Sequence, residues 1–360
     1  SPTSAIISPY GLTIALAENA HANGVEFFLG QEVNSIAKQD DGKFTVETSG
    51  GEIFTADVVI NAAGLSSGKI SKMAGVTEGN NGESLKIWPC RGEYYVLDKR
   101  LDGTLKTLIY PVPGAKDAGL GIHLTPTVDG NILIGPSADY IPEGTPEDYK
   151  VTAPVLEDLR REGQKLLPDI KMSDFIRNFA GNRPKRTSPE EGGNGDFIIE
   201  EAKGVSGFIN LVGIESPGLT SAPAIAEMVR DIVAKHIPLA EKSGFVAERH
   251  GFAGHFCELP PEEQERLVKE NPEYGEIICR CEKITKKEIR DAIENTLGAK
   301  TLVSIKYRAR NGMGRCQGGF CTPRIVRMLR DEYGFKPDDY LFREAGSNLF
   351  TGNVREGEDK

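Results

Sequence analysis

Four cysteines near the C-terminus constrain what this chain can fold into more than any other feature of its sequence. They form two close pairs, Cys279 with Cys281 and Cys316 with Cys321, on either side of a helix-like segment. Alternate side chains of an extended strand point to the same side, so both sulfurs of the first pair can face one metal. Four thiolates suit either zinc or an iron–sulfur cluster, and we expect a small module built around them.

Two other uses of these cysteines have to be weighed. Disulfides are disfavoured because nothing in the chain looks secreted. Zinc sites usually use CxxC pairs, so a CxC pair is less usual in them. Cys90 and Cys257 have no partner at ligand spacing, and we expect both to be buried small apolar residues.

The letters around the cysteines are more specific than their spacing. The first pair lies in the string ICRCE and the second in RNGMGRCQGGFC. The stretch from about Ile277 to Gly334 resembles the bacterioferritin-associated-ferredoxin-like domain. That resemblance implies a 2Fe–2S cluster held by Cys279, Cys281, Cys316 and Cys321.

Local signals agree with such a module. Thr285 and Glu288 have the spacing of a capping box, which predicts a helix running towards Thr296. Thr322-Pro323 predicts the start of a second helix. The glycines before each cysteine of the second pair allow backbone N–H groups to approach a cluster closely.

Charge and hydropathy limit the partners. The formal net charge is −10, which argues against nucleic-acid binding. The cysteine module is nevertheless rich in Lys and Arg; we favour a solvated helix face over a docking face for an acidic electron carrier or partner subunit. No apolar run has membrane-spanning length and no signal peptide is evident. We therefore expect a cytoplasmic protein, with peripheral membrane attachment through another subunit left open.

The hydrophobic pattern predicts an α/β chain in several parts. Helix patterns cover residues 12–22, 67–73, 155–167 and 219–236, and short strands are expected at 25–29, 31–39, 43–48, 52–55, 56–64, 87–97, 107–111, 121–125, 131–134, 175–182, 197–201 and 208–212. The predicted domains are a partial Rossmann-like FAD-binding layer (1–84 and 195–240), an antiparallel substrate sheet (85–194), a linker arm (241–276), a small α-rich 2Fe–2S domain (277–334) and a tail (335–360).

Three segments of the first 240 residues resemble the D-amino-acid-oxidase superfamily of FAD enzymes. Asn61-Ala62-Ala63-Gly64 resembles the strand end where backbone passes the FAD pyrophosphate. The loop from Gly213, followed by a helix, resembles the C-terminal flavin loop, so the resemblance implies cofactor contacts from Val33, Ala63, Gly64, Gly218, Leu219 and Thr220. A helix N-terminus there would stabilise negative charge on a reduced flavin.

One part of that family pattern is missing. The family opens with a strand, a GxGxxG turn and a helix, and no such fingerprint follows a strand in this sequence. The expectation from this departure is that the chain is a fragment of a longer enzyme, and that it binds FAD weakly or not at all by itself.

The combination of the FAD half with this cysteine module is most similar to the catalytic subunits of anaerobic glycerol-3-phosphate dehydrogenases. It implies oxidation of glycerol 3-phosphate to dihydroxyacetone phosphate, with electrons leaving through a partner towards quinone. The strings RGEYY, IYPVP and GIHLT resemble instead the L-2-hydroxyglutarate oxidases and dehydrogenases. Both substrates carry a secondary alcohol near an anion, so an arginine fork suits either one.

Four residues are the candidates for substrate chemistry. Arg183, followed by proline, falls at the family position that holds the substrate anion, against the alternative of a surface ion pair. His123 is the candidate base for the hydroxyl proton, although a lone histidine is as often a hydrogen-bonded core residue. Tyr110 and Arg91 are weaker candidates for orienting the substrate. An electron-transfer or scaffold module with a structural cluster, and an amine or amino-acid dehydrogenase, are the other functional classes.

Overall fold

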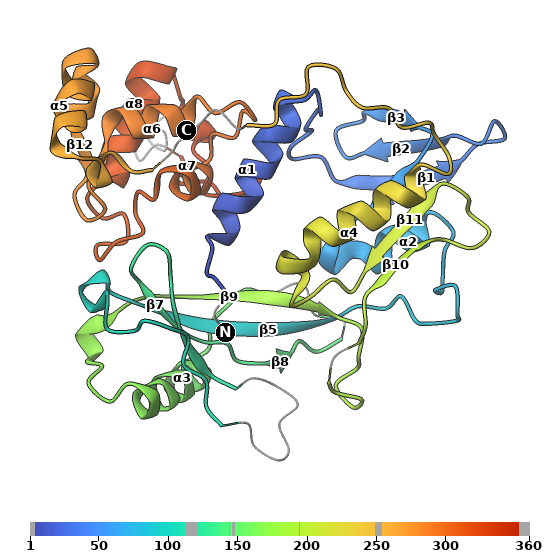
Figure 1. Ribbon diagram of the computed structural model, residues 1–360, viewed down its shortest axis with the longest axis horizontal. Coiled ribbons are helices and arrows are strands. Elements are labelled where there is room, and N and C mark those ends of the chain that lie inside the picture. Colours follow the sequence, from blue (N-terminus) through green and yellow to red (C-terminus); the bar gives the residue numbers. More distant parts are fainter. Residues whose placement is uncertain are drawn as a thin grey trace, which may run out of the picture.

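The computed structural model describes residues 4–112, 121–143, 145, 148–193, 195–248 and 254–352. Figure 1 shows a five-stranded sheet, a second group of strands near β1–β3, and a mainly helical C-terminal module, with helix α1 (Pro9–Ala22) lying between the module and the strands. The predicted α/β class with an antiparallel sheet and a small α-rich module is confirmed. Residues 353–360 of the predicted tail lie outside the described part.

The first part combines an antiparallel meander with a small mixed sheet. The meander consists of β1 (Val33–Lys38), β2 (Phe44–Thr48) and β3 (Ile53–Ala56), paired in that order as the two turn sequences predict. The mixed sheet has the order β10 (Ile198–Glu201), β11 (Phe208–Val212), β4 (Val59–Asn61), with β4 parallel to β11. A shared core joins the two sheets and contains the fully buried rings of Phe44 and Phe208.

Two helices and a short turn belong to this part. The turn η1 (Gly64–Ser66) and helix α2 (Ser67–Met73) follow β4, and helix α4 (Gly218–Val233) follows β11. Residues of α4 pack on β11 through a cluster that contains Ile225 and Val229. Because β4 and β11 are parallel neighbours, their C-terminal ends lie side by side, and each strand leads on to a helix.

The antiparallel sheet is built on two long neighbouring strands, β5 (Trp88–Leu97) and β9 (Phe175–Lys185). The other edge of β5 pairs with β7 (Ile132–Gly135) and β8 (Asp139–Tyr140), and β7 pairs with β6 (His123–Pro126). One face is covered by helix α3 (Ala153–Leu166) over the apolar core of this sheet. The short turns η2 (Lys99–Leu101) and η3 (Met172–Asp174) lie at one end of the two long strands.

The C-terminal module is mainly helical and has its own core, which includes Ile289, Ile305 and Ile325. Its elements in order are η4 (Phe256–Glu258), α5 (Pro261–Glu270), η5 (Pro272–Gly275), β12 (Ile277–Cys279), β13 (Ile284–Thr285), α6 (Lys286–Ile293), α7 (Leu302–Ala309), α8 (Thr322–Tyr333) and η6 (Pro337–Asp339). The predicted capping box is confirmed: Glu288 accepts from the N–H of Thr285 at 2.7 Å while its own N–H donates to the Thr285 hydroxyl at 3.2 Å.

Several boundaries differ from the sequence prediction. Residues 25–29 form no strand, because their apolar side chains are exposed and no described strand pairs with them. The piece expected at 107–111 contributes one bridge, between Ile109 and Leu124. The segment 241–276, expected as an extended arm, contains α5. Two helices, α6 and α7, separate the cysteine pairs where one was expected, and α6 ends at Ile293 rather than near Thr296.

No helix in the described part of the chain is long and apolar enough to cross a membrane.

Candidate functional site

The C-terminal end of β9 lies beside two loops that carry residues predicted for flavin binding. Strand β9 contacts η1, the turn that contains Gly64. Two residues after Arg183, the Nζ of Lys185 lies 3.2 Å from the Oε1 of Glu215, in the loop that leads into α4, and both side chains are buried. Arg183 therefore lies on the strand that joins the loop after β4 to the loop before α4.

The loop after β4 is held by a buried asparagine. The Nδ2 of Asn61 donates to the carbonyl of Ser67 at 2.8 Å and to the Oδ1 of Asn210 at 2.9 Å, which locks the end of β4 to β11 and α2. Ala63 is exposed, and Gly64 has φ +55° with no atom within 4 Å of where a Cβ would lie. The backbone at Gly64 is thus open to close approach by a ligand, as a pyrophosphate requires.

The N-terminus of α4 presents its first turn to solvent. Gly218 is buried against Ile214, whereas Leu219 and Thr220 are exposed. The 16-residue helix directs its unpaired N–H groups and positive dipole end at this surface. Val33, the predicted adenine neighbour, starts β1, whose contacts include α2, and the ion pair of Lys69 with Glu32 at 2.8 Å ties the two together.

Arg183 is held in place by neighbouring strands. Its Nη2 donates to the carbonyl of Ser137 at 2.6 Å and its Nη1 to the sulfur of Cys90 at 3.4 Å. A guanidinium has five N–H donors, so two of them fix the side chain and the others have no described protein partner. Arg183 is directly opposite Cys90 in the β5–β9 ladder, and therefore projects from the same face as Cys90 and Tyr94.

Tyr94 connects Arg183 to the other predicted residues. Its ring stacks on Phe179 with centroids 5.0 Å apart. Burial raises the pKa of Tyr94, while the charge of Arg183 lowers it and Tyr110 raises it; the phenol is therefore close to both. The sequence reasoning missed Tyr94, although the two-residue alternation of β5 could have placed it on the face of Cys90 and Arg183.

His123 has the tautomer that a base needs. Its Nδ1 lies 2.9 Å from the carbonyl oxygen of Gly121, which can only accept, so Nδ1 carries the proton and the Nε2 lone pair is available. Its ring packs on the half-exposed Tyr110, with centroids 4.5 Å apart. Strands β7 and β5 separate β6 from β9, which puts the His123 and Arg183 backbones at least roughly 14 Å apart across the sheet.

Arg91 is not brought together with the other three candidates. It alternates with Cys90 along β5 and lies on the opposite face, where its Nε is 3.2 Å from Glu93 and its Nη1 is 2.9 Å from Asp148. Glu93 is fully buried and also accepts from the backbone N–H of Thr152, at the start of α3, at 2.7 Å. Arg91 therefore has a structural role, in which it forms an ion pair with the buried carboxylate of Glu93.

The four module cysteines meet in two pairs. The side chains of Cys279 and Cys321 interact with each other, and both residues are buried. The side chains of Cys281 and Cys316 likewise interact with each other, and both of these residues are exposed. Within the described ranges, no group of three or more His, Cys, Asp or Glu side chains is arranged to hold a metal ion. Each iron of a 2Fe–2S cluster needs two thiolate ligands, and the two thiol pairs provide that number.

Backbone groups favour thiolates at this place. The hydrogen bond from Cys321, followed by the N–H groups of Gly312 and Glu282, lowers the pKa of Cys279 to about 6. Gly314 lets the two loops meet, because a Cβ there would clash with the Cβ of Cys281. A set of thiolates with converging N–H donors is what an iron–sulfur cluster requires, so these residues fit the group.

All six cysteines lie in the described part of the chain and all are free, so none of them forms a disulfide. Cys90 is fully buried as predicted. Cys257 is half-buried and its sulfur lies 3.8 Å from the carbonyl oxygen of Glu282, in the loop that follows the first cysteine pair.

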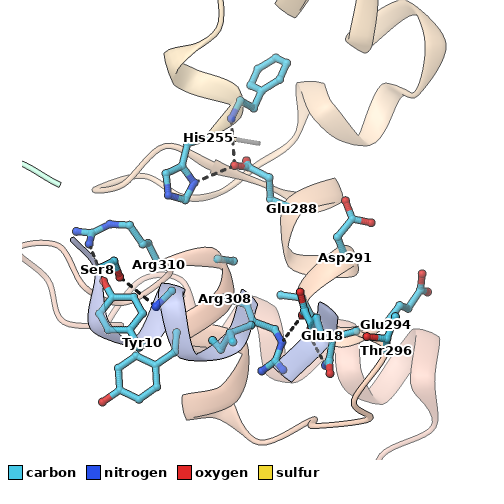
Figure 2. A pocket seen from close by; sticks show the side chains of 18 of the residues that line it. Ser8, Tyr10, Glu18, His255, Glu288, Asp291, Glu294, Thr296, Arg308 and Arg310 are labelled. Atoms are coloured by element: carbon cyan, nitrogen blue, oxygen red, sulfur yellow. Dashed lines mark hydrogen bonds and ion pairs between the residues drawn. The ribbon is translucent and has the colours of Figure 1, made fainter. Parts of the chain in front are cut away.

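A cavity of about 880 Å³ lies elsewhere, between α1 and the C-terminal module. Figure 2 shows Tyr10, Glu18, Arg308, Arg310, His255 and Glu288 around it. None of the residues predicted for substrate, flavin or cluster binding lines it.

Residues 1–232 match the family model described as FAD dependent oxidoreductase. The chain belongs to this family. Residues 277–331 match the BFD-like [2Fe-2S] binding domain. The two resemblances read from the sequence are therefore confirmed. The open backbone at Gly64 and the α4 N-terminus suit an anionic cofactor such as FAD, because backbone N–H donors favour anionic groups.

Several known proteins resemble the chain. A glycerol 3-phosphate dehydrogenase of Caloramator mitchellensis is 41% identical over 98% of this chain and 70% of its own length. One of the subunits of the anaerobic glycerol-3-phosphate dehydrogenase of Escherichia coli is 25% identical, over 90% of this chain and 62% of its own length. The mitochondrial L-2-hydroxyglutarate dehydrogenase of Arabidopsis thaliana is 34% identical over 48% of this chain and 37% of its own length.

Among solved structures, the FAD-bound L-α-glycerophosphate oxidase of Mycoplasma pneumoniae is 31% identical, with a TM-score of 0.50. The alignment covers 61% of this chain and 53% of that protein. The chain thus spans between about a third and 70% of the length of these relatives.

Proposed function

We propose that this protein is the substrate-oxidising part of an FAD-dependent dehydrogenase that converts glycerol 3-phosphate to dihydroxyacetone phosphate. The observation that carries the proposal is Arg183, whose guanidinium is fixed by two neighbours and keeps further donors available, on the strand that contacts the turn containing Gly64. A planar fork with spare N–H groups can bind a phosphate through two parallel hydrogen bonds.

The residues around Arg183 supply the remaining groups. His123 receives the hydroxyl proton at Nε2, since its Nδ1–H is committed to Gly121. Tyr94 is near Arg183 and Tyr110 packs on His123, and these two phenols orient the carbinol. When bound, FAD would supply the hydride acceptor for oxidation of the carbinol carbon. The positive end of α4, at Gly218, favours the negative charge that accompanies this transfer.

We choose glycerol 3-phosphate over L-2-hydroxyglutarate as the proposed substrate because the alignments with relatives of the two kinds cover different shares of the chain. The Caloramator glycerol 3-phosphate dehydrogenase aligns with 98% of the chain, through both the oxidoreductase half and the cysteine module. The Arabidopsis L-2-hydroxyglutarate dehydrogenase aligns with 48% of it. A carboxylate would satisfy Arg183 equally well, so the preference rests on these relatives.

The four cysteines would hold a 2Fe–2S cluster, which would supply one-electron chemistry for transfer to a partner protein. The exposed Cys281 and Cys316 mark the side of the module that such a partner can reach. Basic residues surround them: Arg280 and Lys283 are exposed, and Arg280 and Arg324 both lie over the ring of Phe320. In place of the solvated helix face favoured from the sequence, we propose that an acidic electron-acceptor protein docks here. We also propose that the protein is cytoplasmic, with peripheral attachment to a membrane through such a partner.

The deciding experiment is anaerobic mixing of the FAD- and cluster-loaded protein with each substrate, followed by visible absorbance. Flavin bleaching by glycerol 3-phosphate, with subsequent bleaching of the cluster, is the expected result. Bleaching by L-2-hydroxyglutarate alone would move the protein to that substrate class. Flavin bleaching with a cluster that never changes oxidation state would assign the module a structural role.

A further inference from the structure

The cysteine module meets the oxidoreductase half at a boundary to which several elements contribute. Helix α1 contributes Tyr10, which stacks on Tyr307 with ring centroids 5.0 Å apart. The turn between β6 and β7 contributes Asp129 and Asn131, and η2 contributes Lys99. Figure 2 shows Tyr10 and Arg310 close together on the wall of the large cavity. At this edge of the cavity, the module and the oxidoreductase half therefore contact each other through side chains.

Arg310 contacts each side of this boundary at once. Its Nη1 donates to the hydroxyl of Tyr10 at 3.2 Å and forms an ion pair with Asp129. Its Nη2 donates to the Oδ1 of Asn131 at 3.3 Å and to Glu282 at 3.1 Å. Arg310 is 6% exposed, so these contacts are shielded from water and are stronger than surface pairs.

The charges around Arg310 balance within this cluster. The cations Arg310 and Lys99 face the carboxylates Asp129 and Glu282, and Lys99 lies 2.8 Å from Glu282. Burial lowers the pKa of Arg310, but the two carboxylates outweigh it and the pKa is raised, so the guanidinium stays charged. Removing one member would leave an uncompensated buried charge, which is far more damaging than losing a surface pair.

The same cluster is continuous with the cysteine loops. Glu282 follows Cys281, and its backbone N–H donates to the sulfur of Cys279. Arg310 ends α7 in the left-handed conformation, with φ 60°, and the glycine-rich loop towards Cys316 starts there. Such a conformation is disfavoured for a residue with a Cβ, and the contacts of the Arg310 side chain offset this cost.

We propose that Arg310 is the positioning residue that docks the cluster module on the substrate sheet, through Asp129 and Asn131. Docking at this point holds the cysteine loops at a fixed place relative to the sheet that carries Arg183. The inference concerns the arrangement of the two parts and does not depend on which substrate is oxidised.

Hydrogen–deuterium exchange of the loaded protein tests the proposal. Asp129→Asn removes the ion pair that Arg310 forms across the boundary and leaves Arg310 with Glu282, so the module itself should stay folded. We expect amide exchange at residues 127–131 and 310–314 to rise at least about 30-fold, as for a buried charge pair that loses one partner. Exchange in α6 and α8 and the visible circular dichroism of the cluster should not change.

Two further variants sharpen the result. Arg310→Gln should raise the same amide exchange, and Arg310→Lys should restore part of the protection, because lysine keeps the charge but lacks the fork. In the double variant Asp129→Asn with Arg310→Gln, amide exchange should be little faster than in the more strongly affected single variant. As a control, Arg177→Gln breaks an exposed 2.8 Å hydrogen bond to Gln317 at the same boundary, and should change exchange by less than about threefold.

Unchanged exchange at both segments in Asp129→Asn would overturn the proposal. A rise of equal size throughout α6 and α8 would also overturn it, because it would mean general destabilisation of the module. Neither readout involves substrate, so a failure here is distinct from a failure of the proposed reaction.

Discussion

Replacing Arg183 with alanine is the sharpest test of the substrate site. The side chain is already anchored by Ser137 and Cys90, so its remaining donors can form two hydrogen bonds with a phosphate without further ordering. Hydrogen bonds to charged groups contribute about 1.5 kcal/mol or more each. Their loss removes about 3 kcal/mol, which lowers kcat/KM for glycerol 3-phosphate by roughly 100-fold. Most of the change should appear in KM, with FAD still bound.

The assay is steady-state reduction of an artificial electron acceptor, measured with glycerol 3-phosphate and with glycerol. Glycerol lacks the anion, so Arg183→Ala should scarcely change its already low kcat/KM. Arg183→Lys keeps the charge but loses the fork, and about a tenfold decrease is expected. Arg177→Ala, on the same face at the far end of β9, is the matched control. An unchanged KM, or an equal loss with both substrates, would refute the anion-binding role of Arg183.

Two more predictions concern the module. Cys279→Ser should abolish acid-labile sulfide and the cluster absorbance, because it removes a buried thiolate, whereas Cys257→Ser should retain both; wild-type iron and sulfide in Cys279→Ser would contradict the ligand assignment. Burial, then the charges of Arg177 and Arg343, lower the pKa of Lys306 from 10.5 to about 8. Below pH 8 Lys306 is charged in both the folded and the unfolded state, and burial of the charged ammonium costs free energy in the folded state. Lys306→Met removes this cost, so it should increase the free energy of unfolding by on the order of 1 kcal/mol. The gain should fade between pH 8 and 10.5, as the wild type loses the proton on folding; denaturant titrations across that range measure it, and a gain that grows with pH would contradict the assignment.

The sequence placed most elements because their signals are local. The meander of β1–β3 follows from two glycine-containing turns between alternating strands, and the start of α6 follows from Thr285 and Glu288. Residues 25–29 were wrongly expected as a strand, since an apolar run specifies no pairing partner. Helix α7 was missed, because its pattern merges with the glycine-rich loop that starts at Arg310.

The substrate site was only partly predictable for a related reason. Arg183 and His123 could be chosen by residue type and resemblance, but the face on which each lies depends on strand register. Arg91 and Tyr94 are three residues apart on β5 and therefore project to opposite faces. The pairing of β5 with β9 put Arg183 opposite Cys90 and so on the face that carries Tyr94, whereas Arg91 shares the other face with Glu93.

The sequence by itself determined the chemistry available to this protein: two thiol pairs in glycine-rich loops, a small-residue strand end, and an arginine before a proline. Each is a short stretch whose spacing and residue types carry the information. Only the tertiary structure decided what these stretches face, because Asp129, Glu282 and Arg310 are far apart along the chain yet share one buried cluster. Their charges are stable inside the protein only when folding brings them together, and no local pattern records that requirement.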